Sequence, residues 1–136
     1  MKRKLVLLGA ASLVIAVVNL AAIHAQEASG NIKRETVLKQ DMTIPGREVI
    51  MAEVELAPGA TEGLHSHPSA ELFGFVVEGT IQAEIEGKPP RTLKAGDHFY
   101  FAPGLVHQNT NRSSSPAKTY VVFVAEKGKP LTVPAR

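Results

Sequence analysis

Four side chains that can bind a metal ion occur in two separated stretches of this chain. The first stretch carries His65, His67 and Glu71, and the second carries His107. Residues at even spacing point to one face of an extended strand, so the first three could converge from a single segment. His107 could then close the site from elsewhere in the fold. Three imidazoles and one carboxylate suit a divalent transition metal, so the pattern predicts metal-dependent chemistry or specific capture of a ligand.

The N-terminus has the pattern of a secretory signal peptide. Basic residues at positions 2–4 precede an apolar run that ends at Ile23, and the small residue Ala25 follows. We expect cleavage after Ala25, so residues 1–25 are assigned to a signal peptide and the mature protein to the periplasm or the extracellular space. The alternative is an uncleaved anchor, because the apolar run approaches the length that spans a bilayer.

Removal of this leader would change the charge of the protein. The chain of 136 residues contains 15 Lys and Arg and 13 Asp and Glu, which gives a net charge of +2. The leader holds three of the basic residues and no acidic residue, so the mature protein would carry about −1. No basic stripe with interleaved aromatic residues remains, so we expect neither a nucleic acid nor, after cleavage, a membrane as partner. The chain has no cysteine, so any metal would be held by nitrogen and oxygen.

The rest of the chain consists of short segments rich in β-branched and aromatic residues, separated by glycine and proline. In one of them Ile81, Ala83 and Ile85 alternate with polar residues, which is typical of a half-buried strand. The pattern predicts an all-β sandwich or barrel with one core. The predicted strands are residues 35–39, 48–56, 64–67, 72–77, 80–86, 91–93, 98–101, 107–110 and 119–125.

Three regions follow the predicted signal peptide. Residues 26–46 are predicted to form an N-terminal extension with the first strand, and residues 47–126 the barrel. Residues 127–136, which contain two prolines, are expected to be an extended or poorly ordered tail.

The two stretches that carry the predicted ligands resemble the two motifs of the cupin superfamily. These motifs read G-x5-HxH-x3/4-E-x6-G and G-x5-P-x-G-x2-H-x3-N. Two departures are present: Gly79 lies one residue later than the spacing from Glu71 requires, and Ala102 stands where proline is expected. We expect a β-bulge to absorb the extra residue, with Gly74 well placed to form it. The matching residues are Gly59, His65, His67, Glu71, Gly96, Gly104, His107 and Asn111.

The resemblance implies a single-domain cupin β-barrel, of the double-stranded β-helix or jelly-roll type, with one metal site. It implies His65, His67, Glu71 and His107 as ligands of one divalent transition metal, which could be Fe, Mn, Ni, Cu or Zn. The chain resembles the quercetin-dioxygenase-like branch in particular, which implies an oxygenase for a small phenolic or enol-type substrate. Glu71 would there be both a ligand and the catalytic proton acceptor.

Two other functions are compatible with the same residues. One is a non-catalytic module that binds a small molecule, and the other is a metal-dependent isomerase or decarboxylase. Small cupins commonly pair, so the resemblance also implies a homodimer. An exposed strand edge at residues 35–39 or 48–56 could provide the contact.

The remaining residues of interest are given structural roles. Asn111 is predicted to be a turn residue. His98 is predicted to be structural, with contact to a metal ligand or to substrate as the alternative. The aromatic residues predicted to lie in the core are Phe73, Phe75, Phe99, Tyr100 and Phe101.

Overall fold

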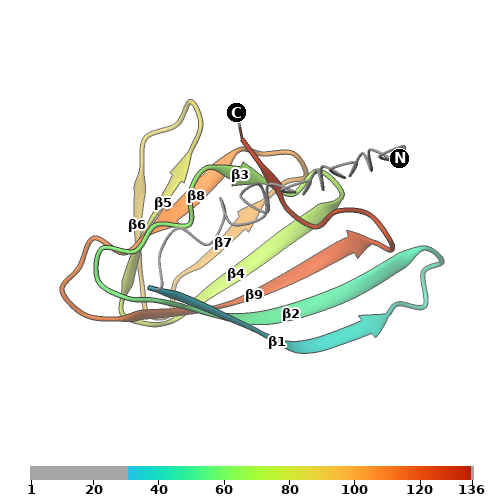
Figure 1. Cartoon of the computed structure of the whole chain (residues 1–136), viewed down its shortest axis with the longest axis horizontal. Coiled ribbons are helices and arrows are strands. Elements are labelled where there is room, and N and C mark those ends of the chain that lie inside the picture. The colour runs from blue at the N-terminus through green and yellow to red at the C-terminus, as the bar shows by residue number, and fades with distance from the viewer. Residues whose placement is uncertain (1–30, 136) are drawn as a thin grey trace, which may run out of the picture.

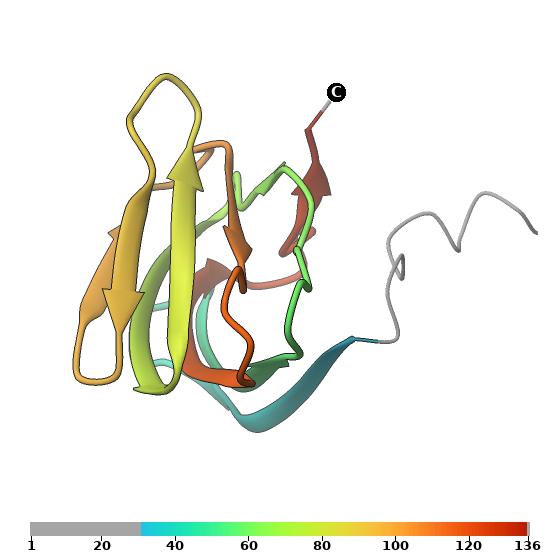
Figure 2. The ribbon, with the colours of Figure 1, turned by 90° about the vertical axis from the view of Figure 1, so that its left-hand side faces the viewer.

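The computed structural model describes residues 31–135, which form two five-stranded antiparallel sheets packed around one core (Figures 1 and 2). The predicted signal peptide lies outside the described residues. Residues 31–135 contain no helix, and hence none that could span a membrane. The predicted all-β fold is therefore confirmed.

The first sheet, sheet A, contains the long strands of the protein. Its order is β1-β2-β9-β4-β7. These strands are β1 (Ile32–Asp41), β2 (Arg47–Leu56), β9 (Ala117–Glu126), β4 (Ala70–Glu78) and β7 (His98–Phe101).

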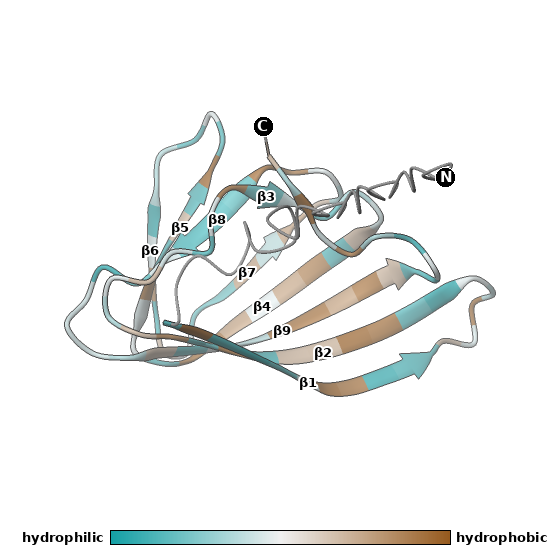
Figure 3. Cartoon of the chain, viewed as in Figure 1, coloured by the Kyte–Doolittle hydropathy of each residue, from teal (hydrophilic) through white to brown (hydrophobic). Residues whose placement is uncertain are grey.

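The second sheet, sheet B, is built from shorter strands in the order β10-β3-β8-β5-β6. Its central strand is mostly polar, whereas β4 and β9 of sheet A are mostly apolar (Figure 3). The strands of sheet B are β10 (Val133–Pro134), β3 (His65–Ser66), β8 (His107–Thr110), β5 (Thr80–Ile85) and β6 (Arg91–Lys94). The sequence predicted every strand of both sheets except β10.

Regular alternation along sheet A directs one face of each strand into the core. In β9 every second residue from Ala117 to Ala125 is buried. In β4 the buried positions include Ala70, Leu72 and Gly74. Two of these pair with aromatic residues: Leu72 lies between Phe101 on β7 and Phe123 on β9, and Gly74 lies opposite Phe99 on β7.

Gly74 does not form the bulge that the sequence predicted. A β carbon at this position would overlap the ring of Phe99 on β7, so glycine is required by the close approach of that ring. The irregularity in β4 lies further on, between Val76 and Glu78. It comes after Glu71 in the chain and leaves the direction of that side chain unchanged.

The five aromatic residues predicted for the core divide between the two faces of sheet A. Phe99 and Phe101 are buried, as predicted. Phe73, Phe75 and Tyr100 are each between 45% and 49% exposed, so their assignment to the core is wrong. The reason is the period of two, because these three alternate with residues whose side chains point inward.

The two predicted candidates for an exposed edge differ in their pairing. β1 is an edge strand of sheet A and is exposed along most of its length. β2 pairs with β1 on one side and with β9 on the other, so residues 48–56 have no free edge and that candidate is wrong.

Candidate metal centre

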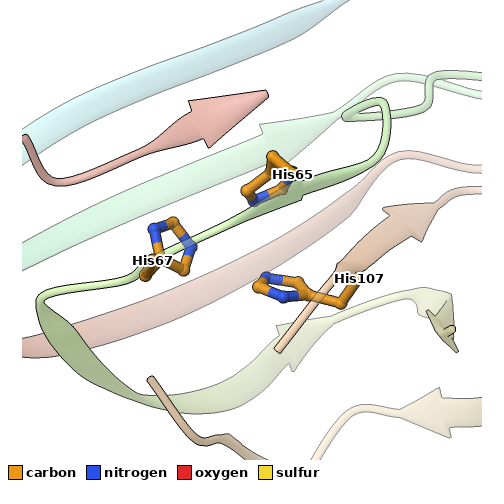
Figure 4. A group of neighbouring side chains, drawn as sticks. All are labelled: His65, His67 and His107. Carbon is orange, nitrogen blue, oxygen red and sulfur yellow. The ribbon is translucent and has the colours of Figure 1, made fainter. Parts of the chain in front are cut away.

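Three histidines converge between the two sheets (Figure 4). His65 lies in β3, His67 directly follows that strand, and His107 opens β8. β3 pairs with β8 such that His65 lies opposite His107. One ring nitrogen of each histidine lies within 4.8 Å of those of the other two, and all three side chains are buried. The three histidines could therefore hold one metal ion, as the sequence predicted.

A backbone carbonyl accepts a hydrogen bond from the Nδ1 atom of each histidine. The acceptor is Gly63 O for His65 at 2.7 Å, Leu105 O for His107 at 2.8 Å, and Leu131 O for His67 at 2.8 Å. A carbonyl can only accept, so Nδ1 carries the proton and Nε2 keeps its lone pair. Metal-binding histidines are held in this way.

Burial lowers the pKa of two of the histidines. The pKa of both His67 and His107 falls to about 4, chiefly because the charged ring would lose its contact with water. Both rings are therefore neutral at pH 7, which is the form that binds metals. The Nε2 atom of His107 is also buried without a hydrogen-bond partner among the described residues. A metal ion would satisfy this lone pair, so the donor set fits a divalent transition metal.

Apolar side chains of sheet A form one wall of the site. The ring of Phe101 lies 4.0 Å from that of His107, and the ring of Phe123 lies 4.9 Å from that of His67, both measured between centroids. Leu72 is the strand partner of both phenylalanines. The histidines therefore face a part of the core from which water is largely excluded.

The fourth predicted ligand, Glu71, does not lie with the histidines. Its side chain is on the exposed face of β4, where Glu71 Oε2 accepts a 3.4 Å hydrogen bond from the hydroxyl of Tyr100. The cause is alternation, since the neighbours Ala70 and Leu72 point inward and Glu71 must point outward. The structure thus supports neither metal binding nor a catalytic role for Glu71.

Leu72 occupies the place where the cupin motif puts its glutamate. The motif allows three or four residues after the second histidine, and four residues after His67 lead to position 72. The interval from there to Gly79 then has the six residues that the motif requires. The sequence alone could therefore have corrected the prediction. If position 72 rather than Glu71 is aligned with the glutamate of the motif, Gly79 has the expected spacing and no extra residue remains.

A partly buried carboxylate that the sequence did not predict lies near the site. Glu62 Oε2 accepts hydrogen bonds from the backbone N of Asn109 at 3.2 Å and from its Nδ2 at 2.9 Å. Glu62 Oε1 pairs with Arg34 at 3.1 Å. The negative charge of Glu62 favours the protonated form of His67, although burial outweighs it and lowers the His67 pKa overall. No motif includes Glu62, so the pattern gave no signal for it.

Asn109 itself presents an unused acceptor. It is buried on β8, and its Oδ1 has no hydrogen-bond partner among the described residues. The carboxylate of Glu62 fixes this orientation, because a flipped amide would place two acceptor oxygens together. Asn109 and His107 are two residues apart on β8, so their side chains point to the same face.

Asn111 has the turn role that was predicted. It is fully buried, and its Nδ2 donates to the carbonyls of Leu56 and Ser115. Its Oδ1 accepts from the backbone and the hydroxyl of Ser113. His98, by contrast, is exposed on β7 opposite Phe75 and is not part of the histidine cluster.

Comparison with known proteins agrees with this geometry. The family model "Cupin domain" matches residues 52–123, which is more than half of the chain. The protein is a cupin. This cupin is 35% identical over 89 residues to germin-like protein subfamily 2 member 1 of Arabidopsis thaliana, a match that covers 60% of this chain and 41% of the relative. It spans about half the length, or less, of the curated relatives it matches.

Solved structures show the same fold. An uncharacterized conserved protein with a double-stranded β-helix domain from Klebsiella pneumoniae subsp. pneumoniae aligns with a TM-score of 0.67 at 21% identity, over 84% of this cupin and 92% of that chain. Recombinant oxalate oxidase in complex with glycolate aligns with a TM-score of 0.62 at 26% identity, over 79% of this cupin and 57% of that chain.

Proposed function

We propose that this cupin is an exported mononuclear metal-dependent oxygenase that acts on a small organic molecule with a phenolic or enol-type hydroxyl. The observation that carries the proposal is the convergence of three buried histidines with their Nδ1 atoms tied to carbonyls. One divalent transition metal, with Fe, Mn, Ni, Cu and Zn as candidates, would supply Lewis-acid chemistry there and, for the redox-active ions, electron transfer. Three protein ligands leave room for substrate on a six-coordinate ion.

The protein contributes orientation, exclusion of water and a polar contact. The three carbonyls hold the imidazoles in one tautomer, and Phe101 and Phe123 shield the site, which strengthens electrostatic interactions inside it. We propose that Asn109 Oδ1 accepts a hydrogen bond from a substrate hydroxyl. The likeness to oxalate oxidase, solved with glycolate, supports a small ligand rich in oxygen.

A non-catalytic binding module is the second candidate. It is favoured by the place of Glu71, because no carboxylate of residues 31–135 joins the three histidines within ligand distance of one another. A metal-dependent isomerase or decarboxylase is the third, since neither reaction needs dioxygen.

We propose a small molecule, rather than nucleic acid or a membrane, as the partner, and export to the periplasm or the extracellular space.

We also propose a homodimer in which the edge strand β1 pairs with its counterpart, since β1 exposes Val37 and Leu38 beside its unpaired backbone. Leu38→Lys should then give a monomer by light scattering. A wild-type protein that is already monomeric would contradict the dimer.

The test of the metal site is elemental analysis of the untagged protein after reconstitution. We expect about one metal equivalent in the wild type and in His98→Ala, and none in the His65→Ala/His107→Ala double variant. His98→Ala is the matched control, because it removes an exposed histidine of the same domain. No bound metal in the wild type would overturn the proposed function.

Turnover separates the three candidate functions. The metal-loaded protein is incubated with phenols, enols and hydroxy acids, both in air and under nitrogen. Oxygen uptake with a substrate supports the oxygenase, product under nitrogen indicates an isomerase or decarboxylase, and binding without conversion indicates the module. Asn109→Ala should weaken binding of a hydroxy acid and leave that of its methyl ether unchanged.

A further inference from the structure

The C-terminal segment 131–135, called the C-terminal strap below, returns to β3, which contains His65 and directly precedes His67. Within it β10 pairs with β3, so that Val133 lies opposite Ser66 and Pro134 opposite His65. The amide of Ala135 donates to Leu64 O at 3.0 Å. Figures 1 and 2 show the strap running beside β3 at the edge of sheet B. A segment predicted to be a tail is thus part of the wall around the histidines.

Within residues 31–135, the long-range hydrogen bonds to the ring nitrogens of the cluster come from the strap. His65 and His107 each use a carbonyl two residues earlier in the chain, so those bonds are set locally. His67 instead uses Leu131 O, 64 residues away, and the hydroxyl of Thr132 lies 3.3 Å from the same Nδ1. The orientation and tautomer of His67 therefore depend on a docked strap.

The strap is held by few contacts. Leu131 is partly buried and packs against the core, whereas Thr132, Val133 and Pro134 are exposed. Among the described residues, its backbone–backbone hydrogen bonds are limited to a two-residue ladder and the Ala135 amide. A short, exposed edge element of this kind opens locally at a lower free energy than the long strands of sheet A.

We propose that the C-terminal strap is a positioning element of the metal site, and that its docking and metal binding are thermodynamically coupled. This inference rests on the proposed metal centre. When the strap is docked, Leu131 O presents His67 with Nε2 toward the other two histidines. When it opens, His67 Nδ1 loses its acceptor and the ring becomes free to rotate. Linkage is reciprocal, so a bound metal must hold the strap closed by the same factor by which the strap tightens metal binding.

The first experiment compares Zn²⁺ affinity by calorimetry in the full-length protein and in a variant that ends at Pro130. Loss of an outer-shell partner of a metal ligand weakens binding by about 10–100-fold, and we expect a decrease of that size. Leu131→Ser keeps the carbonyl but removes the apolar anchor, so it should give an intermediate decrease. Lys129→Ala is the matched control, because it changes an exposed residue just before the strap and should bind Zn²⁺ like the wild type.

The second experiment follows amide hydrogen exchange in the full-length protein with and without Zn²⁺, so it does not depend on a truncated chain. We expect Zn²⁺ to slow exchange of the Ala135 amide, which bonds Leu64 O, and to leave the Lys127 amide, which bonds Gly46 O outside the strap, unchanged. Unchanged affinity on truncation together with unchanged exchange at Ala135 overturns the coupling and leaves the metal centre intact. Absence of Zn²⁺ binding by the full-length protein overturns both.

Discussion

The inner and outer faces of β4 differ in burial, and the residue types alone do not predict which face is buried. The inner face carries small or aliphatic residues and is buried, whereas the outer face carries two phenylalanines and a glutamate and is exposed. The inner residues are Ala70, Leu72, Gly74 and Val76, and the outer residues are Glu71, Phe73, Phe75 and Val77.

The neighbouring strands explain this difference. Phe99 and Phe101 on β7 and Phe123 on β9 fill the inner side, so β4 contributes small or aliphatic residues there. Strand register therefore decides which face is buried, and hydrophobicity alone is a weak guide to it.

The largest expected effect comes from placing a carboxylate on the inner face. Leu72→Glu should lower the free energy of unfolding of the metal-free protein by about 4 kcal/mol or more, because a buried unpaired charge is among the most destabilising changes. Added metal should recover part of this loss, since position 72 matches the glutamate of the motif. Urea unfolding with and without Zn²⁺ measures both. The matched control on the outer face is Phe73→Glu, with an expected change within about 0.5 kcal/mol. Equal losses in the two variants would contradict the assignment of the faces.

A smaller effect is expected from one added methyl group on the same face. Gly74→Ala should destabilise the protein by about 1–3 kcal/mol, because the β carbon overlaps the Phe99 ring in a filled core. The double variant Gly74→Ala/Phe99→Leu should recover part of the loss if this overlap is the cause. Additive losses would show that the ring is not what excludes a side chain at position 74.

The two buried histidines His67 and His107 make the stability of the metal-free protein depend on pH. The pKa of His67 and of His107 is about 4 in the folded protein, against about 6.5 for an unfolded chain. Below about pH 6.5 the unfolded chain takes up protons that the folded protein does not. The stability of the metal-free protein should therefore fall as the pH is lowered from about 6.5 to about 4, and this contribution should then level off.

Urea midpoints at several pH values in EDTA measure this dependence. The His67→Gln/His107→Gln variant should have a flatter profile over that range, whereas His98→Ala should keep the profile of the wild type. A double variant with the wild-type slope would mean that these two histidines do not cause the dependence.

The smallest effect is expected on the outer face of β4. Glu71→Gln should change the free energy of unfolding by no more than about 0.5 kcal/mol and leave the metal content unchanged, since the side chain is exposed and its 3.4 Å bond to Tyr100 is weak. Loss of metal in this variant would restore Glu71 to the ligand set.

Most of the fold could be predicted from the sequence because strands in this chain are separated by glycine and proline and alternate clearly. The alternation of Ile81, Ala83 and Ile85 is a local signal and needs no knowledge of the neighbours. β10 was missed because two residues carry no period, and its pairing with β3 depends on tertiary contact.

The site was predicted as far as short-range spacing determines it. His65 and His67 at i and i+2 share a face, and the second motif supplied His107. The place of Glu71 depends on where the strand begins, because a shift of one residue reverses the facing of every side chain. The dependence of His67 on Leu131 and the pairing of Glu62 with Asn109 join residues 64 and 47 apart in the chain, and no local pattern records them.

The three histidines and their carbonyl partners are far apart along the chain, and this separation bears on when the proposed metal could bind. His65 and His107 meet only after β3 has paired with β8, and His67 is fixed only after residues 131–135 have returned to β3. Contacts between residues so distant in sequence form slowly, because the entropy cost of closing the long loops precedes the stabilisation that the contacts give. An emerging or partly folded chain therefore does not bring the three histidines together, and we predict that the proposed metal binds after folding rather than nucleating it.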